Sequence, residues 1–243
     1  TDMNAPGGYT LQGHFSNTTS LNKIQAGNWD FVVLQEQSQL PSFPDSMITS
    51  DVFPYAHKLD SVINRYNHCC ETVFYMTWGR KNGDNTNCAE WPPVCTYAGM
   101  DSLLYKRYME MTEQNNAVVS PVGAVWKYIR EQYPAIELYA SDNSHPSPAG
   151  SFAAACCFAT VLFQKDPTLS GYNYTIPSTD AALIKEAVKS VVYNNLTKWK
   201  VGSYTTSAAF NYTKLNETLI SFVNQSSNGE RYSWQFGDGQ ISA

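Results

Sequence analysis

The chain has 243 residues, which is long for one domain and short for two, and it fits one α/β unit of about 200 residues with a small part appended. Hydrophobic residues make up 43% of it and charged residues 15%, which excludes a disordered chain, a coiled coil and a collagen-like repeat. The net charge is −5 and no cluster of Lys and Arg occurs, so we expect neither a nucleic-acid nor an anionic-membrane partner. The longest apolar stretch, residues 152–163, is too short to cross a bilayer, so we expect no membrane insertion.

Short apolar runs alternate with amphipathic segments up to about residue 165. The runs predict strands over 28–35, 71–78, 117–120 and 137–140, and the amphipathic segments predict helices over 51–66, 100–115, 122–133 and 148–163. A polar loop over 79–97 separates the second strand from its helix. Strands that alternate with such helices predict βαβ units and a parallel sheet covered on both faces.

The character of the chain changes after Pro167. Residues 179–199 predict one more amphipathic helix, with Asp180 near its start and Lys198 near its end, as the helix dipole favours. Residues 201–228 are rich in Ser, Thr and Asn and predict a linker or extra strands. We therefore expect a main domain over residues 1–200, this segment over 201–228, and the beginning of a further domain over 229–243.

Six cysteines bear on the compartment. Cys88 and Cys95 bracket a six-residue loop, and a disulfide that closes this loop is sterically reasonable. The neighbouring pairs Cys69–Cys70 and Cys156–Cys157 are either buried free thiols or form a bridge between the two clusters. The sequence has no Cys-x-x-Cys motif and no His at a matching spacing, so it does not predict a metal site.

Two kinds of triplet permit glycosylation. Asn-x-Ser/Thr sequons occur at Asn17, Asn173, Asn195, Asn211, Asn216 and Asn224. Asp-Ser-apolar triplets at Ser46, Ser61 and Ser102 resemble the O-glycosylation sites of secreted Bacteroidetes proteins. Such triplets also arise by chance in an Asn-rich chain.

A short loop after the last predicted strand carries a candidate catalytic pair. In Ser141-Asp142-Asn143-Ser144-His145-Pro146, the carboxylate of Asp142 is able to orient His145 through Nδ1–H, which leaves Nε2 free to accept a proton from a serine. The alternative is that Asp142 caps a turn and His145 is an exposed loop residue.

Three stretches in this order resemble the SGNH (GDSL-type) hydrolase family: residues 29–38 (Trp-Asp-Phe-Val-Val-Leu-Gln-Glu-Gln-Ser), Thr77-Trp78-Gly79, and Asp142-Asn143-Ser144-His145-Pro146-Ser147. The resemblance implies a flavodoxin-like three-layer α/β/α fold with a parallel sheet. It also implies that Asp142 and His145 are catalytic, and it implies no cofactor or metal.

The resemblance also points to an oxyanion hole. The family uses an Asn amide after the strand that here ends at Leu34. In this sequence Gln35 or Gln37 stands in its place. The family also uses the backbone N–H of a Gly, a role that Gly7 or Gly8 fits because a residue without Cβ lets the backbone approach the substrate. The alternatives are a strand end that satisfies buried backbone groups and a plain Gly-Gly turn.

The family's nucleophile is a Ser after a first strand, and neither that strand nor its Gly-Asp-Ser block precedes the Gly-Gly turn. Ser16 and Ser20 follow no apolar strand. We therefore expect the first strand to be missing from the chain and its place to be filled by an upstream piece of the gene product, by strand addition from another copy, or by an altered sheet order.

The two ends support a longer gene product. The chain starts at Thr1 without an initiator Met or signal core, as a processed or trimmed product does. Residues 232–239, Tyr-Ser-Trp-Gln-Phe-Gly-Asp-Gly, resemble the start of a PKD-type β-sandwich repeat. With the glycosylation triplets, this resemblance favours a secreted or cell-surface protein.

Two readings of function follow. The favoured one is a secreted SGNH-type serine esterase that acts on acylated carbohydrate, with the serine upstream and with Trp78, Trp91 and Tyr97 as a candidate sugar-stacking platform; aromatic residues this frequent also serve as core or surface filler. The alternative is a catalytically incomplete structural or adhesive surface protein that self-associates through the missing strand. A pure carbohydrate-binding module has only the aromatic platform in its favour.

Overall fold

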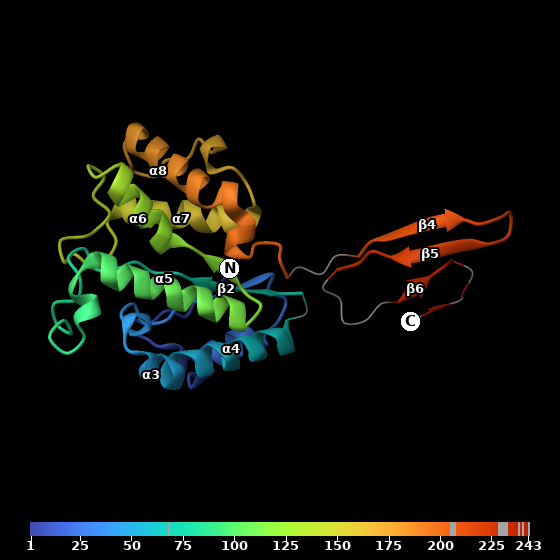
Figure 1. Ribbon diagram of the computed structural model, residues 1–243, viewed down its shortest axis with the longest axis horizontal. Helices are drawn as coiled ribbons and strands as arrows, with labels where there is room; N and C mark the ends of the chain where they lie inside the picture. The colour runs from blue at the N-terminus through green and yellow to red at the C-terminus, as the bar shows by residue number, and fades with distance from the viewer. Residues whose placement is uncertain (68, 205–207, 228–232, 238, 240, 243) are drawn as a thin grey trace. The chain divides into compact units, whose positions relative to one another are not determined.

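The computed structural model describes residues 1–67, 69–204, 208–227, 233–237, 239 and 241–242. The chain divides into two compact units, residues 1–201 and 202–243, each with strands of its own (Figure 1). No helix among the described residues is long and apolar enough to span a membrane.

The first unit is built on a three-stranded parallel sheet in the order β1-β2-β3. Its strands are β1 (Phe31–Leu34), β2 (Glu71–Tyr75) and β3 (Val118–Ser120). The register pairs Phe31 with Glu71 and Val73 with Val118. These three strands lie within predicted strands, so the parallel α/β sheet is confirmed.

Helices connect and flank the strands. They are α1 (Leu11–Phe15), α2 (Thr18–Gln25), α3 (Asp45–Met47), α4 (Phe53–Tyr66), α5 (Tyr97–Gln114), α6 (Val122–Gln132), α7 (Pro148–Phe163) and α8 (Ser178–Val191). Short helical turns are η1 (Leu40–Ser42), the π-helical η2 (Ile48–Val52), η3 (Pro92–Cys95), η4 (Pro167–Leu169) and η5 (Tyr193–Trp199). Figure 1 shows α6, α7 and α8 gathered together, with α3 and α4 on the other side of the unit. Both α5 and α7 pack against β3.

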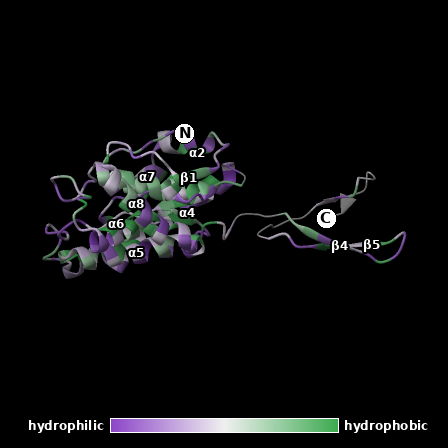
Figure 2. Cartoon of the chain, turned by 90° about the horizontal axis from the view of Figure 1, so that it is seen from above, coloured by the Kyte–Doolittle hydropathy of each residue, from purple (hydrophilic) through white to green (hydrophobic). Residues whose placement is uncertain are grey.

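The core of the first unit lies where these helices meet the sheet, and hydrophobic residues concentrate there in Figure 2. Its largest fully buried side chains include Trp126, Trp199, Tyr108 and Phe74. All three residues of β3 are buried, whereas β1 is the edge strand at the other end of the sheet and its Val33 is 43% exposed. No described strand pairs with the outer edge of β1, which is called its open edge below.

The prediction of a strand over 137–140 is wrong. Only Tyr139 forms a bridge, an isolated antiparallel one with Pro146. The chain turns back at once, with the N–H of Ala140 bonded to the carbonyl of His145 at 2.8 Å and the N–H of Ser147 bonded to the carbonyl of Leu138 at 2.8 Å. A ladder cannot grow through Pro146, because proline has no backbone N–H to donate.

The helix predicted over 179–199 is interrupted. It ends as α8 at Val191 and continues as the turns of η5, in which Asn195 has a non-helical backbone at φ −139°. Helices α1 and α2 were not predicted, because their segment is polar and has little apolar periodicity. Their N-caps are Thr10 and Asn17, whose side chains accept the N–H groups of Gly13 and Ser20.

The described part of the second unit contains two pairs of antiparallel strands. Strand β4 (Phe210–Lys214) pairs with β5 (Ile220–Asn224), and β6 (Trp234–Gln235) pairs with β7 (Ile241–Ser242). Segment 201–228 thus takes the strand alternative. The ring of Trp234 lies 5.8 Å from that of Phe210 and 6.0 Å from that of Phe222. Tyr232 and Asp238 of the PKD-like run lie outside the described residues, so that resemblance stays a prediction.

Candidate active site

The loop before α7 holds an Asp–His pair. Oδ2 of Asp142 lies 2.5 Å from Nδ1 of His145, and Oδ1 accepts the backbone N–H groups of Ser144 and His145 at 2.9 Å each. The bond to the imidazole and these two N–H groups lower the pKa of Asp142 to about 2. The carboxylate therefore holds the ring of His145 by Nδ1 and leaves Nε2 free.

The same loop is fastened to its surroundings on both sides. The carbonyl of Ser144 accepts the indole N–H of Trp78 at 3.1 Å, and the carbonyl of Asn143 accepts the N–H of Lys81 at 2.9 Å. Asn143 adopts a left-handed backbone, φ 59°, which Asn tolerates better than most residues. Ser147 then caps α7, since its Oγ accepts the N–H of Gly150 at 3.1 Å. The position of His145 is thus set by Asp142 of its own loop, by the segment 78–81 and by the start of α7.

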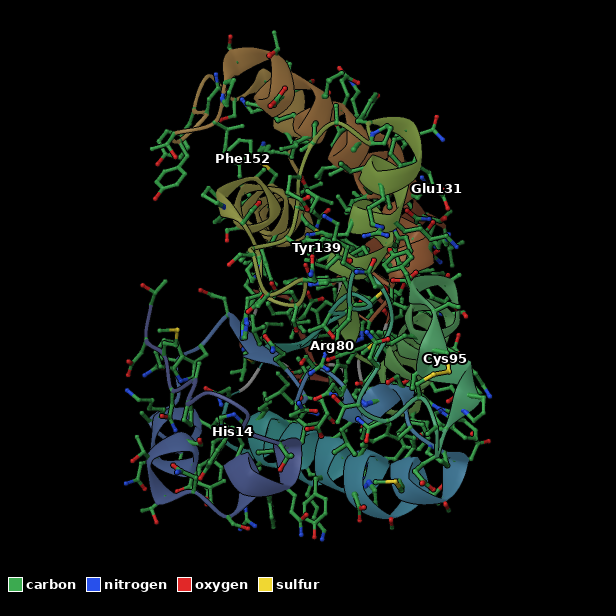
Figure 3. All side chains as sticks on the ribbon, turned by 90° about the vertical axis from the view of Figure 1, so that its left-hand side faces the viewer. His14, Arg80, Cys95, Glu131, Tyr139 and Phe152 are labelled. Atoms are coloured by element: carbon green, nitrogen blue, oxygen red, sulfur yellow. A yellow bond between two sulfur atoms is a disulfide. The ribbon has the colours of Figure 1, made fainter. Side chains whose placement is uncertain are left out.

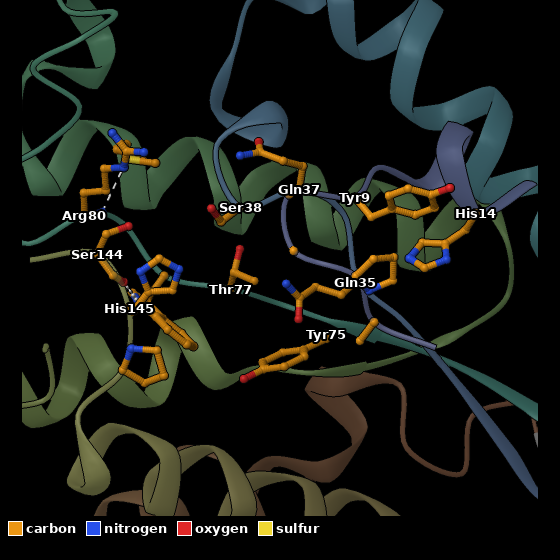
Figure 4. A pocket seen from close by; sticks show the side chains of 17 residues that line it. Tyr9, His14, Gln35, Gln37, Ser38, Tyr75, Thr77, Arg80, Ser144 and His145 are labelled. Atoms are coloured by element: carbon orange, nitrogen blue, oxygen red, sulfur yellow. Dashed lines mark hydrogen bonds between the residues drawn. The ribbon is translucent and has the colours of Figure 1, made fainter. Parts of the chain in front are cut away.

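His145 opens onto a cavity of about 380 Å³ (Figure 4). Its wall comes from the N-terminal segment, the ends of β1 and β2, and the loop before α7. The lining residues are Ala5, Pro6, Gly7, Gly8, Tyr9, His14, Gln35, Gln37, Ser38, Tyr75, Thr77, Trp78, Arg80, Met100, Ser144, His145 and Pro146. The carboxyl ends of parallel strands are where such folds bind ligands.

All four residues predicted for the oxyanion hole line this cavity. The side chain of Gln37 is engaged: its Oε1 accepts the N–H groups of Gln39 and Leu40 at 2.9 Å, and its Nε2 donates to Oε1 of Gln39 at 3.3 Å. Gln35 is exposed, and no hydrogen-bond partner of its amide is found among the described residues. The structure thus separates two glutamines that the sequence left equivalent.

Gly7 and Gly8 lie in open space at the cavity wall. A Cβ built on either residue would meet nothing within 4 Å, and Gly8 has φ +71°. The backbone here is therefore approachable from the cavity, and the positive φ of Gly8 favours glycine.

Glu36, between the two glutamines, was not predicted as part of the site. It is 1% exposed, and its carboxylate accepts the N–H of Leu11 at 3.2 Å and the N–H of Gln37 at 2.6 Å. Burial raises the pKa of Glu36 to about 7, although the two N–H groups oppose this shift. Leu11 begins α1, so Glu36 ties the N-terminal cavity segment to the end of β1.

The three residues of the predicted aromatic platform are not brought together. Only Trp78 lines the cavity, and its ring stacks on Trp126 with the centroids 3.8 Å apart. Trp91 donates its indole N–H to the carbonyl of Ser42 at 2.9 Å, and Tyr97 lies under the guanidinium of Arg130 at 3.9 Å. Tyr75, which the sequence did not single out, adds an aromatic ring to the cavity wall.

The predicted disulfide between Cys88 and Cys95 is confirmed, and Figure 3 shows it well apart from His14. Cys69, Cys70, Cys156 and Cys157 are free thiols, so the structure has no bridge between the two clusters. Burial raises the pKa of Cys156 to about 11. No group of His, Cys, Asp and Glu among the described residues is suited to hold a metal ion.

The glycosylation candidates differ in solvent exposure. The residues that are exposed are Ser46, Ser61, Ser102, Asn195, Asn211, Asn216 and Asn224. Asn17 and Asn173 are half-buried: Nδ2 of Asn17 donates to the hydroxyl of Tyr9 at 3.0 Å, and Oδ1 of Asn173 accepts from Nζ of Lys185 at 2.7 Å. These triplets stay predictions.

Several lining residues were missed by sequence reasoning. His14, Ser38, Thr77 and Arg80 come from three separate segments, and only the resemblance of residues 29–38 and 77–79 pointed to two of them. Thr77 is buried, and its Oγ1 has no hydrogen-bond partner among the described atoms. Nothing in the sequence signalled His14, because its contacts with Tyr9 and with Ser20 of α2 depend on the fold.

Comparison with known proteins supports the fold. No protein-family profile and no curated protein sequence matches the chain. A DUF4886 family protein from Bacteroides uniformis is similar in structure, with a TM-score of 0.65 and 14% identity over 79% of this chain and 81% of that one. A "putative SGNH hydrolase" from Slackia heliotrinireducens is similar with a TM-score of 0.52 and 25% identity over 63% of this chain and 79% of that one. The first unit therefore has an α/β fold of the SGNH-hydrolase kind.

Proposed function

We propose that the chain is part of an SGNH-type serine hydrolase that cleaves esters, with His145 as general base and Asp142 as its orienting carboxylate. The observation that carries the proposal is the 2.5 Å contact between Oδ2 of Asp142 and Nδ1 of His145 at the edge of the cavity. This contact fixes the tautomer in which Nε2 accepts a proton.

The reaction needs three groups besides the base. A serine Oγ attacks the ester carbonyl while Nε2 of His145 takes its proton, and the imidazolium then protonates the leaving alkoxide. Water cleaves the acyl-enzyme in the same way, and the serine is regenerated. The backbone N–H of Gly7 or Gly8 and the amide of Gln35 stabilise the oxyanion; Gln35 is preferred over Gln37 because its amide is unengaged.

The serine is supplied from outside the described segment, on a strand that pairs with the open edge of β1. No strand among the described residues pairs with this edge, and Val33 of β1 is 43% exposed. A parallel strand added there ends beside Gln35, at the cavity, so a serine after its last residue faces His145. An upstream piece of the same gene product is the simplest source.

The substrate is an acylated carbohydrate, and the protein acts outside the cell. Of the residues that line the cavity in the described chain, none is a carboxylate, and Tyr75 and Trp78 give it aromatic walls. Such a wall suits an uncharged sugar ester. The disulfide between Cys88 and Cys95 is compatible with an oxidising compartment.

The test is labelling of the full-length native protein with a fluorophosphonate, followed by peptide mass mapping. We expect the label on a serine in a strand-like peptide upstream of Thr1. His145→Ala abolishes labelling and Asp142→Asn slows it about 10⁴-fold, because the ring then loses its orienting carboxylate. His57→Ala is the matched control, since His57 is exposed, bonds to the amide of Asn115 at 3.2 Å and does not line the cavity.

Two results contradict the proposal. A label on Ser38 or Ser144, which line the cavity, places the nucleophile within this chain and overturns the added strand. If the full-length protein is folded and none of its serines is labelled, ester hydrolysis is overturned.

The open edge of β1 also favours a second function, a structural or adhesive surface protein in which one copy donates a strand to the next. Val33→Lys then abolishes self-association measured by light scattering, because an edge charge blocks strand pairing. A wild-type protein that is monomeric at all concentrations contradicts this second function.

A further inference from the structure

A polar network behind the cavity links four side chains of the N-terminal segment. Nδ2 of Asn4 lies 2.7 Å from Oγ of Ser20 and 3.2 Å from Oδ1 of Asn17. The backbone N–H of Ser20 donates to the same Oδ1 at 3.0 Å, and Oγ of Ser20 lies 2.8 Å from Nδ1 of His14. Ser20 is buried, so its hydroxyl depends on these partners.

The donors and acceptors of this network determine the tautomer of His14. Oδ1 of Asn17 accepts from a backbone N–H, so Asn4 must present its NH₂ group to it and to Ser20. Oγ of Ser20 therefore accepts from Asn4 and has its own hydrogen left to donate. Nδ1 of His14 is the acceptor within reach among the described atoms. The hydrogen of the imidazole then sits on Nε2.

His14 is held in place by its neighbours, and its surroundings favour the neutral form. Its ring meets the ring of Tyr9 edge-on with the centroids 4.8 Å apart, and the Tyr9 hydroxyl is itself fixed by Nδ2 of Asn17 at 3.0 Å. Burial lowers the pKa of His14, which favours the neutral imidazole. No hydrogen-bond partner of its Nε2 is found in the part of the chain that the structure describes.

His14 lines the same cavity as His145. Figure 4 shows the two rings at opposite ends of the row of lining side chains, with Thr77 and Gln35 between them. Both lining histidines are fixed through Nδ1, one by a carboxylate and one by a hydroxyl. Nε2 of His145 is thereby an acceptor and Nε2–H of His14 is a donor.

We propose that His14 forms a substrate subsite, in which its Nε2–H donates a hydrogen bond to an uncharged oxygen of the ligand, a carbonyl or hydroxyl remote from the ester bond that is cut. The sugar-ester nature of that ligand rests on the function proposed above, whereas the donor itself rests on the network alone. The described lining contains no carboxylate, and its guanidinium, that of Arg80, is paired with Asp84 at 3.0 Å. A neutral donor in such a wall selects an oxygen acceptor and does not attract a cation.

The tautomer is tested on the full chain by ¹⁵N NMR of labelled histidine, since protonated and unprotonated ring nitrogens have distinct shifts. We expect the hydrogen of His14 on Nε2 in the wild type, and a mixture of both forms in Ser20→Ala, where Nδ1 has lost its donor. His57 serves as the control and stays unchanged in Ser20→Ala. A wild-type His14 that carries its hydrogen on Nδ1 overturns the proposal.

Ligand binding is tested with xylose tetraacetate in the His145→Ala background, which prevents turnover. We expect the Nε2 resonance of His14 to shift on titration. His14→Phe keeps a planar ring but removes the donor, and weakens binding about tenfold; His14→Gln, which retains an N–H donor, recovers part of the loss. Thermal melting of each variant checks that the fold is intact.

The outcomes separate the two proposals. Equal affinities of the His14→Phe variant and its parent overturn the subsite, and so does a parent that fails to bind the sugar ester. Binding that depends on His14, together with the absence of fluorophosphonate labelling in the full-length protein that retains His145, supports the subsite and overturns ester hydrolysis instead.

Discussion

Glu36 is a buried carboxylate without a cationic partner among the described residues, and it shows how one residue couples the cavity to stability. Its carboxylate accepts the backbone N–H groups of Leu11 and Gln37, and the carboxylate of Asp51 raises its pKa further. The folded state therefore binds a proton more tightly at Glu36 than the unfolded chain does.

This difference predicts a pH dependence of stability. The folded-state pKa of Glu36 is about 7 and the ordinary value is 4.5, so the stabilisation is complete below pH 4.5 and is lost as the pH rises to 7. The loss amounts to about 3 kcal/mol of unfolding free energy. Glu36→Gln removes it, because the amide imitates the protonated acid and keeps an oxygen for the two N–H groups.

Chemical denaturation at pH 4.5 and at pH 8 measures this effect as the difference between the wild type and Glu36→Gln. Asp101, whose pKa is raised by burial to about 6, adds a loss of the same sign to both proteins and cancels in the difference. Glu131→Gln, an exposed change on α6, is the control and behaves as the wild type. Parallel pH profiles of the wild type and Glu36→Gln would contradict the prediction, because they would show that ionisation of Glu36 does not change the free energy of unfolding.

Residue types predicted the contact between Asp142 and His145 but not its surroundings. Asp-x-x-His is a local signal, because the turn brings Asp142 and His145 together within four residues. The sequence could not predict that Gln35 is a better candidate than Gln37, because this depends on the hydrogen bonds of the Gln37 amide to Gln39 and Leu40. The role of Glu36 depends on Leu11, 25 residues away in sequence.

Among the elements, those with a strong hydrophobic period were predicted and those held by caps or contacts were not. The apolar runs of β1, β2 and β3 and the stripe of α4 mark a core that any arrangement must bury. The polar helices α1 and α2 are stabilised by side-chain caps and by packing on α4, which a window of sequence does not reveal. The segment over 137–140 has strand composition, yet Pro146 ends its ladder after one bridge.

The start of α7 gives a prediction at this scale. Ser147 lies two residues after His145. Its Oγ accepts the N–H of Gly150 and donates to the carbonyl of Glu137 at 2.7 Å. Ser147→Ala therefore costs about 1–2 kcal/mol of unfolding free energy and also releases the loop that holds His145. We expect slower fluorophosphonate labelling of the full-length protein.

Thr96→Ala is the matched change. Thr96 caps α5 in the same way, accepting the N–H of Gly99 at 3.1 Å, and it does not line the cavity. We expect Thr96→Ala to lower the unfolding free energy by about 1 kcal/mol without altering the labelling rate. Equal labelling rates for Ser147→Ala and Thr96→Ala would mean that the cap of α7 serves stability only.

At the scale of the whole molecule, the buried hydrophobic residues among those described all lie in the first unit. The buried hydrophobic residues end with Trp199 and Val201, and the rings that pack in the second unit belong to β4, β5 and the segment from Trp234 to Phe236. A core that is complete within one unit is expected to fold without the other.

Removal of residues 205–243 is therefore predicted to leave the first unit intact. Calorimetry of the shortened protein should give the same unfolding midpoint as the corresponding transition of the full chain, because Trp199 keeps its buried place and its indole N–H bond to Val191 at 2.7 Å. Cutting before Trp199 instead removes a fully buried indole and should cost about 3–5 kcal/mol, which makes it the positive control. A midpoint that falls as far in the first cut as in the second would show that the second unit contributes to the stability of the sheet that carries His145.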